Sequence, residues 1–123
     1  MNASADQIQI IDAARGPELA IVEGEGRAHA VVWPGVGAQQ RSLHVISLAP
    51  GARTVELSHR SEAVYHVGGG SGEAVEARSG ERYALRPGSM VHVDPGTAYV
   101  LAAGEEGMEV VGGPSPPDLS LYA

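Results

Sequence analysis

The sequence predicts an all-β protein, a sandwich or barrel, on three observations. Short apolar stretches recur at roughly even spacing along the chain, and turn residues close each of them. No segment offers ten or more residues with apolar positions at helical spacing and a cap. Phe is absent and Trp occurs once, so the core is built from Val, Leu, Ile and Ala, and β-branched side chains suit a pleated sheet.

The expected strands follow one another from residue 8 to residue 111, each a run rich in Val, Ile, Leu or Ala that ends at a turn. Gly and Pro supply most of these turns, as in Pro50-Gly51, Pro87-Gly88 and Pro95-Gly96. In chain order the strands are Ile8–Ile11, Leu19–Val22, Ala28–Trp33, Leu43–Leu48, Arg53–Leu57, Ala63–Val67, Glu73–Ala77, Arg82–Leu85, Met90–Val93, Ala98–Ala102 and Met108–Val111.

A chain of 123 residues has room for one domain and one core. We expect a disordered N-terminus over residues 1–5, one barrel over residues 6–113 and an extended Pro-rich tail over residues 114–123. The prolines of the tail lack the N–H that a strand ladder needs. Its apolar side chains, Leu119, Leu121 and Tyr122, would dock on the barrel or on a partner.

The charge balance limits the partners. Fifteen acidic residues stand against eight basic ones, for a net charge of −7, which argues against nucleic acid and against anionic membrane surfaces. No apolar run approaches the ~20 residues of a transmembrane helix, so we expect a cytoplasmic protein. All basic side chains are Arg and Cys is absent, which excludes lysine Schiff bases and thiol nucleophiles.

Two stretches have the residue order of a known family. Gly51, His59, Glu62 and Gly69 resemble the first motif of the cupin superfamily, which reads Gly, five residues, His-x-His, three or four residues, Glu, six residues, Gly. The second motif reads Gly, five residues, Pro-x-Gly, two residues, His, three residues, Asn. Gly88, Pro95 and Gly96 match this second motif, and Tyr99 stands at the position of its His. The resemblance spans about residues 42 to 111 and implies a single cupin-type β-barrel (jelly roll).

The resemblance also implies where a metal would lie. Metal-binding cupins hold a divalent ion with three His and one Glu, and His59 and Glu62 stand at two of these positions. Leu57 and Tyr99 occupy the other two, and a leucine cannot bind a metal while a phenol rarely does. The gap from His59 to Glu62 is also one residue shorter than in the family. No cofactor is therefore favoured, with a divalent transition metal on His59 and Glu62 as the alternative.

Strand alternation extends this set of interior residues. If Glu62 points into the barrel, His66 shares its face, and if Leu48 points inward, so does His44. The direction of His92 stays open, because it depends on a bulge near Asp94. The candidate catalytic residues are Glu62, His59, Tyr99 and His66, and the candidate substrate-binding residues are His44, Arg53 and Arg60.

The two arginines would match a carboxylate or phosphate on the substrate. Each residue also has a plain structural explanation: an exposed or hydrogen-bonded His, a core Tyr, an Arg-paired Glu62, or a solvated Arg. A buried carboxylate is costly unless it is paired or ligating, which makes Glu62 the most informative candidate.

Three functions fit these residues. The first is an enzyme that acts on a small polar metabolite by acid–base chemistry, as an isomerase, cyclase, dehydratase or lyase. The second is a metal-dependent oxygenase or lyase, in which His44, His66 or His92 completes the ligand set. The third is a non-catalytic module that binds a small ligand. We also expect a homodimer, paired through the apolar strands Ile8–Ile11 and Leu19–Val22.

Overall fold

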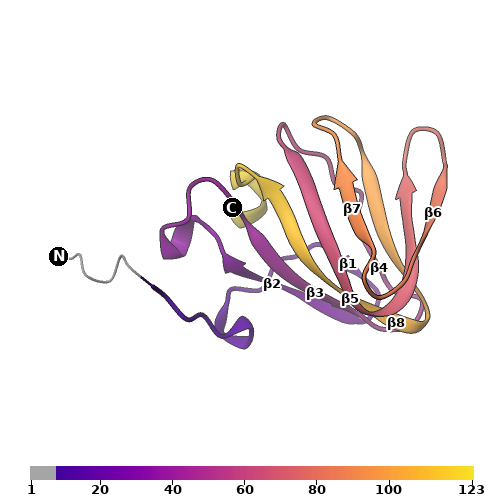
Figure 1. The fold of residues 1–123 in the computed structure, drawn as a ribbon, viewed down its shortest axis with the longest axis horizontal. Helices are drawn as coiled ribbons and strands as arrows, with labels where there is room; N and C mark the ends of the chain where they lie inside the picture. Colours follow the sequence, from indigo (N-terminus) through magenta and orange to yellow (C-terminus); the bar gives the residue numbers. More distant parts are fainter. Residues whose placement is uncertain (1–7) are drawn as a thin grey trace.

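The computed structural model describes residues 8–123, so the expected disorder of residues 1–5 lies outside the described part of the chain. The strands of this part form one barrel-shaped antiparallel sheet (Figure 1). They are β1 (Val22–Glu23), β2 (Gly26–Val32), β3 (Leu43–Leu48), β4 (Arg53–Thr54), β5 (Glu62–Glu76), β6 (Arg82–Leu85), β7 (Met90–Val93) and β8 (Tyr99–Ser115). The described residues also form short 3₁₀ turns: η2 (Ala13–Arg15) precedes β1, η3 (Pro34–Val36) lies between β2 and β3, and η4 (Leu119–Tyr122) follows β8.

Two long strands carry the barrel, and each replaces two of the expected strands. The first half of β5 pairs with β7 and its second half with β6, while both halves pair with β8. The sequence predicted a turn at the glycines in the middle of β5, but β5 continues through them and only bends. Gly70 has φ +72°, and a Cβ there would lie 2.1 Å from the carbonyl oxygen of Gly107 on β8. The glycine run therefore bends a continuous strand, and register shifts mark the bend.

The two ends of the described chain differ from expectation. No strand forms over Ile8–Ile11, and the side chains of Ile8 and Ile10 are exposed. Leu19 and Ile21, expected at a dimer edge, are buried in the chain's own core, which removes that edge. The homodimer stays a prediction that sedimentation of the purified chain would test.

At the other end β8 runs to Ser115, two residues past the expected end of the barrel. The carbonyl oxygen of Pro114 accepts hydrogen bonds from the backbone and side chain of Ser42, which tie this end of β8 to the residue before β3 although Pro114 has no N–H to donate. The residues that follow then fold back over the barrel as η4 instead of running extended.

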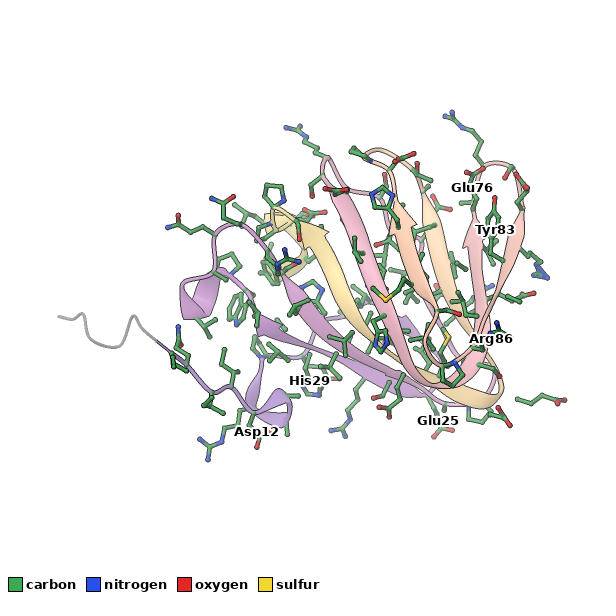
Figure 2. All side chains as sticks on the ribbon, in the orientation of Figure 1. Asp12, Glu25, His29, Glu76, Tyr83 and Arg86 are labelled. Atoms are coloured by element: carbon green, nitrogen blue, oxygen red, sulfur yellow. The ribbon has the colours of Figure 1, made fainter. Side chains whose placement is uncertain are left out.

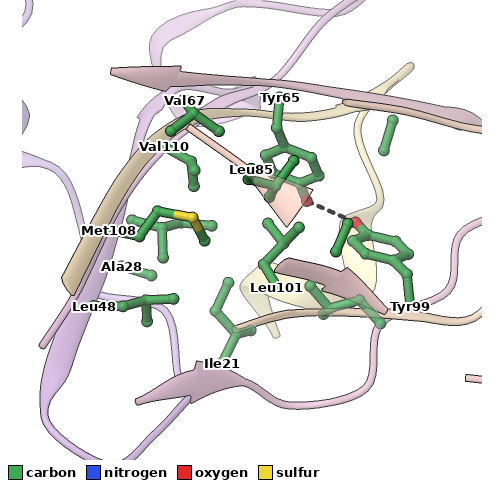
Figure 3. Packing of buried hydrophobic residues seen from close by; sticks show 14 of the residues in the cluster. Ile21, Ala28, Leu48, Tyr65, Val67, Leu85, Tyr99, Leu101, Met108 and Val110 are labelled. Carbon is green, nitrogen blue, oxygen red and sulfur yellow. Dashed lines mark hydrogen bonds between the residues drawn. The ribbon is translucent and has the colours of Figure 1, made fainter. Parts of the chain in front are cut away.

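The core lies inside the barrel and is mostly aliphatic. Leu101, Ile46, Val67 and Val110 are almost fully buried. Figure 3 shows this packing and, to one side of it, a hydrogen-bonded pair of phenols, Tyr65 and Tyr99. The apolar residues thus leave one end of the interior to polar side chains. Within residues 8–123 no helix is long and apolar enough to cross a membrane.

Candidate functional site

Four polar side chains form a hydrogen-bonded chain inside the barrel. His59, which precedes β5, has Nδ1 2.6 Å from Asp118 Oδ2 and Nε2 2.8 Å from the hydroxyl of Tyr99. The Tyr99 hydroxyl lies 2.6 Å from that of Tyr65. Backbone bonds fix the two central residues, since Leu57 and Tyr99 pair across the ladder and Gly96 N–H donates to the carbonyl of His59. We call Asp118, His59, Tyr99 and Tyr65 the relay.

Each relay contact has a consistent donor. An ionised carboxylate only accepts, so His59 Nδ1–H donates to Asp118. The Nε2 atom of a neutral His59 then accepts from the Tyr99 hydroxyl, whose oxygen accepts from the Tyr65 hydroxyl. One lone pair of the Tyr99 oxygen stays free in this arrangement. Each donor in this chain therefore has an acceptor, and among the described residues no buried side-chain nitrogen or oxygen lacks a hydrogen-bond partner.

Burial sets the protonation states of the relay. It raises the pKa of Tyr65 to about 12 and raises the pKa of Tyr99 as well, because a phenolate is poorly solvated inside the barrel. Partial burial also acts to raise the pKa of Asp118, but hydrogen bonds from His59 and Ser120 outweigh it and hold that pKa below its ordinary value. At neutral pH the relay has two neutral phenols and one carboxylate.

The C-terminal segment, residues 116–123, brings Asp118 to the barrel. Asp118 caps η4 and accepts from the backbone and hydroxyl of Ser120. Tyr122 packs against Trp33, with ring centroids 5.0 Å apart, and its hydroxyl lies 2.7 Å from His44 Nε2. Ser61 Oγ donates to the carbonyl of Pro116 at 2.7 Å. The segment therefore contributes directly to the candidate site.

His44 points inward, as expected if Leu48 does, since both are buried on β3. Burial, and then the nearby His59, lower the pKa of His44 to about 4. The imidazole is thus neutral at pH 7 and holds the C-terminal segment through Tyr122. His44 lines neither of the two cavities that flank the relay, so contact with a substrate is not supported.

Two cavities flank the relay. The first, of about 470 Å³, lies between β6 and β7, which both pair with β5, and we call it the Tyr99 cavity. It is lined by Ala74, Val75, Glu76, Tyr83, Ala84, Leu85, Ser89, Met90, Val91, His92, Val93, Asp94, Thr97 and Tyr99. The second, of about 510 Å³, lies beside the C-terminal segment, with His59 and Asp118 in its wall. The relay thus spans from one cavity to the other.

Two candidate catalytic residues lie on the outer face of β5, not inside the barrel. Glu62 and His66 are exposed on the outer surface of β5, while Ala63, Tyr65 and Val67 point inward. The expectation that Glu62 and His66 lie inside is therefore wrong. The physical reason is the two-residue period of a strand, because a one-residue error in register moves every side chain to the other face. Glu62 instead pairs with His92, also exposed, at 2.6 Å.

Glu62→Gln is expected to change the free energy of unfolding by less than about 1 kcal/mol, since exposed ion pairs contribute little. Chemical denaturation at pH 7 measures this. A loss of several kcal/mol would contradict the outward position, and His66→Gln on the same face is the matched control.

The two candidate arginines also lie away from the relay. Arg53 pairs with Glu23 at 3.2 Å with most of its side chain in solvent, and Arg60 is exposed. Neither arginine lines one of the two cavities that flank the relay. The expectation that they contact a substrate carboxylate or phosphate is therefore not supported for a substrate bound there. The sequence analysis missed Asp118 and Tyr65, and expected Tyr122 only to dock on the barrel or on a partner. An inward Ala63 would have indicated Tyr65 through strand alternation, whereas nothing local marked Asp118.

The residues present do not fit the metal centre of the family. His59 and Glu62 lie on opposite faces of the barrel wall, and both nitrogens of His59 are hydrogen-bonded. His66 and His92 face outward, and His44 is bonded to Tyr122. Among the described residues no group of three or more His, Cys, Asp or Glu side chains is placed to hold an ion. The expected ligand pair is therefore contradicted, and so is its completion by another His.

The fold has many solved relatives. A cupin-like protein from Thermotoga maritima superimposes with a TM-score of 0.71 at 23% identity, over 87% of this chain and 80% of that one. The polyketide cyclase RemF from Streptomyces resistomycificus gives 0.69 at 18% identity, over 90% and 83%. KdgF from Halomonas sp. gives 0.71 at 17%, over 89% and 94%. No family model and no curated protein matches the sequence. Identities this low establish the fold alone.

Proposed function

From the cupin fold of this chain and the relay inside it, we propose an enzyme that moves a proton on a small molecule bound in the Tyr99 cavity. The observation that carries the proposal is the continuous hydrogen-bonded chain from Asp118 through His59 to Tyr99, a residue in the cavity wall. Isomerisation, cyclisation, dehydration and lyase reactions all need such proton transfer and no external electron acceptor.

The transfer proceeds through Tyr99, the catalytic residue. A substrate C–H or O–H gives its proton to the free lone pair of the Tyr99 oxygen, while the Tyr99 proton passes to His59 Nε2. The electron pair of the broken bond stays on the substrate. A free phenolate is never formed, which matters because burial raises the pKa of Tyr99. The reverse transfer returns a proton to the same or another substrate atom and completes the reaction.

The other relay residues support these steps as positioning groups. The Asp118 carboxylate stabilises the imidazolium of His59 and fixes its tautomer. Tyr65 donates to the Tyr99 oxygen and stabilises negative charge that develops there. Solved proteins with this fold include a polyketide cyclase and an ectoine synthase, whose names are consistent with catalysis in such a barrel.

Proton exchange in D₂O tests the proposal without knowledge of the product. The protein is incubated with a panel of small ketones, enols and hydroxy compounds, and mass spectrometry detects deuterium uptake or conversion. We expect uptake with the wild type and its loss in Tyr99→Phe and His59→Gln, with His66→Gln as the unaffected control. A compound that binds in the cavity with no exchange and no conversion would support the non-catalytic module instead.

Asp118→Asn is expected to lower kcat about 100-fold and to leave KM nearly unchanged, because the amide cannot compensate the imidazolium charge. Steady-state kinetics on a compound from that panel measures both constants. Asp12→Asn is a matched control, since the Asp12 side chain also caps a 3₁₀ turn, η2, but lies outside both cavity linings. An unchanged kcat in Asp118→Asn would remove Asp118 from the mechanism.

A further inference from the structure

The Tyr99 cavity combines an apolar wall with an acidic rim. Seven of its lining residues are aliphatic or Met: Ala74, Val75, Ala84, Leu85, Met90, Val91 and Val93. The groups in the lining that carry formal negative charge at pH 7 are Glu76 and Asp94, and no Arg is among them. The chain has no Lys, so the lining lacks a permanent cation.

The arginines of the barrel lie elsewhere. Arg82 is directed to Glu73 at 3.7 Å, with most of its side chain in solvent. Figure 2 shows Glu76 and Tyr83 together at one end of the β5–β6 hairpin and Arg86 toward its opposite end. Arg78, in the turn that joins the two strands, is exposed and outside the cavity lining.

The side chain of Tyr83 lies close to two carboxylates at this end of the hairpin, those of Glu81 and Glu76. The charge of Glu81 in the first place, then desolvation and the charge of Glu76, raise the pKa of the Tyr83 phenol. Glu81 therefore adds a second carboxylate to Glu76 at this end of the hairpin. The ring of His92, another lining residue, faces two carboxylates, Glu62 at 2.6 Å and Asp94 at 3.8 Å.

We propose that the Tyr99 cavity takes a largely apolar small molecule that is neutral or carries an amine, and rejects carboxylates and phosphates. The volume of about 470 Å³ suits a ligand of drug size. Its apolar body lies along β6 and β7, its reacting end reaches Tyr99, and an ammonium group lies at the rim between Glu76 and Asp94. An anion at the same place is repelled by both carboxylates. This inference rests on the proposed function in one point only, that the end of the ligand next to Tyr99 is the end that reacts.

Three compounds with one ring test the charge preference: tyramine, neutral 4-ethylphenol and 3-(4-hydroxyphenyl)propanoate. Titration followed by methyl NMR gives each Kd and locates the compound through the lining residues Leu85 and Val93. We expect tyramine to bind about tenfold more tightly than the carboxylate at low salt, with 4-ethylphenol between them, and the ratio to shrink as salt screens the rim.

The double variant Glu76→Gln/Asp94→Asn is expected to bring that ratio close to one. Glu25→Gln/Glu105→Gln removes the same charge from exposed residues outside the cavity and should keep the preference. Equal or tighter binding of the carboxylate by the wild type would overturn the inference. So would an unchanged ratio in the double variant, shifts confined to the second cavity, or no shift with any of the three compounds.

The binding test is independent of turnover. Tyr99→Phe should keep the charge preference, because the rim is untouched. A preserved preference with full activity in Tyr99→Phe would refute the proposed function alone, and a relay-dependent activity without the preference would refute the inference alone.

Discussion

Replacement of Tyr99 by phenylalanine is expected to lower kcat by about 10²- to 10⁴-fold, the usual contribution of a positioned acid–base group. The variant removes the hydroxyl that links the Tyr99 cavity to His59, so the proton of a substrate bound there has no path to the imidazole. Kinetics across pH 5 to 9 on a compound found by deuterium exchange measures the effect. The ring itself stays, which preserves the packing around it.

The same substitution leaves His59 Nε2 and the Tyr65 hydroxyl without their shared partner. Loss of these hydrogen bonds costs about 1–3 kcal/mol in the free energy of unfolding, so chemical denaturation of the variant must be measured beside its kinetics. Tyr65→Phe removes only the supporting hydrogen bond and should reduce kcat far less. A Tyr99→Phe protein that is folded and as active as the wild type would refute Tyr99 as the catalytic residue.

Acid is expected to destabilise the protein through the buried His44 as the pH falls below 6.5. The pKa of His44 falls from 6.5 to about 4 on folding. Between these pH values the unfolded chain binds a proton that the folded chain does not, so stability is lost as pH decreases from 6.5 to 4. The full difference corresponds to about 3 kcal/mol, since one pKa unit is about 1.4 kcal/mol. Urea denaturation at a series of pH values measures it.

His44→Gln should flatten this part of the pH profile, because the amide accepts from Tyr122 but does not titrate. His66→Gln, on the outer face of β5, is the matched control and should keep the slope. Asp118 acts in a different window, since its lowered folded pKa gives stability that is present above about pH 3.8 and lost below it. An unchanged slope in His44→Gln would contradict a buried, neutral imidazole.

Local sequence patterns were sufficient for the all-β class and for the limits of several strands. The limits of β3, β6 and β7 coincide with the expected Leu43–Leu48, Arg82–Leu85 and Met90–Val93. Such short runs between Gly and Pro have few other ways to satisfy their backbone groups. The motif spacing also placed His59 and Tyr99, and the structure brings these two residues into hydrogen-bond contact.

The inward face of β5 was harder to predict, because either of its two faces could point into the barrel. Glu62, His66 and Val64 alternate with Ala63, Tyr65 and Val67, and the polar set attracted the functional assignment. The family spacing of three residues after His59 leads to Ala63, and burial of the apolar set against the core decides the face. An alternating pattern defines two faces, but contacts with other strands choose which one is inside.

The sequence by itself determined an all-β barrel with the cupin spacing of turns and placed His59 and Tyr99 at motif positions inside it. Only the tertiary structure decided the rest of the site: the outward face of Glu62, and the return of the C-terminal segment that sets Asp118 beside His59, 59 positions earlier in the chain. The physical reason is that local pattern fixes backbone conformation over a few residues. The partners of a buried polar group come from whichever segment covers it, and packing of the whole chain selects that segment.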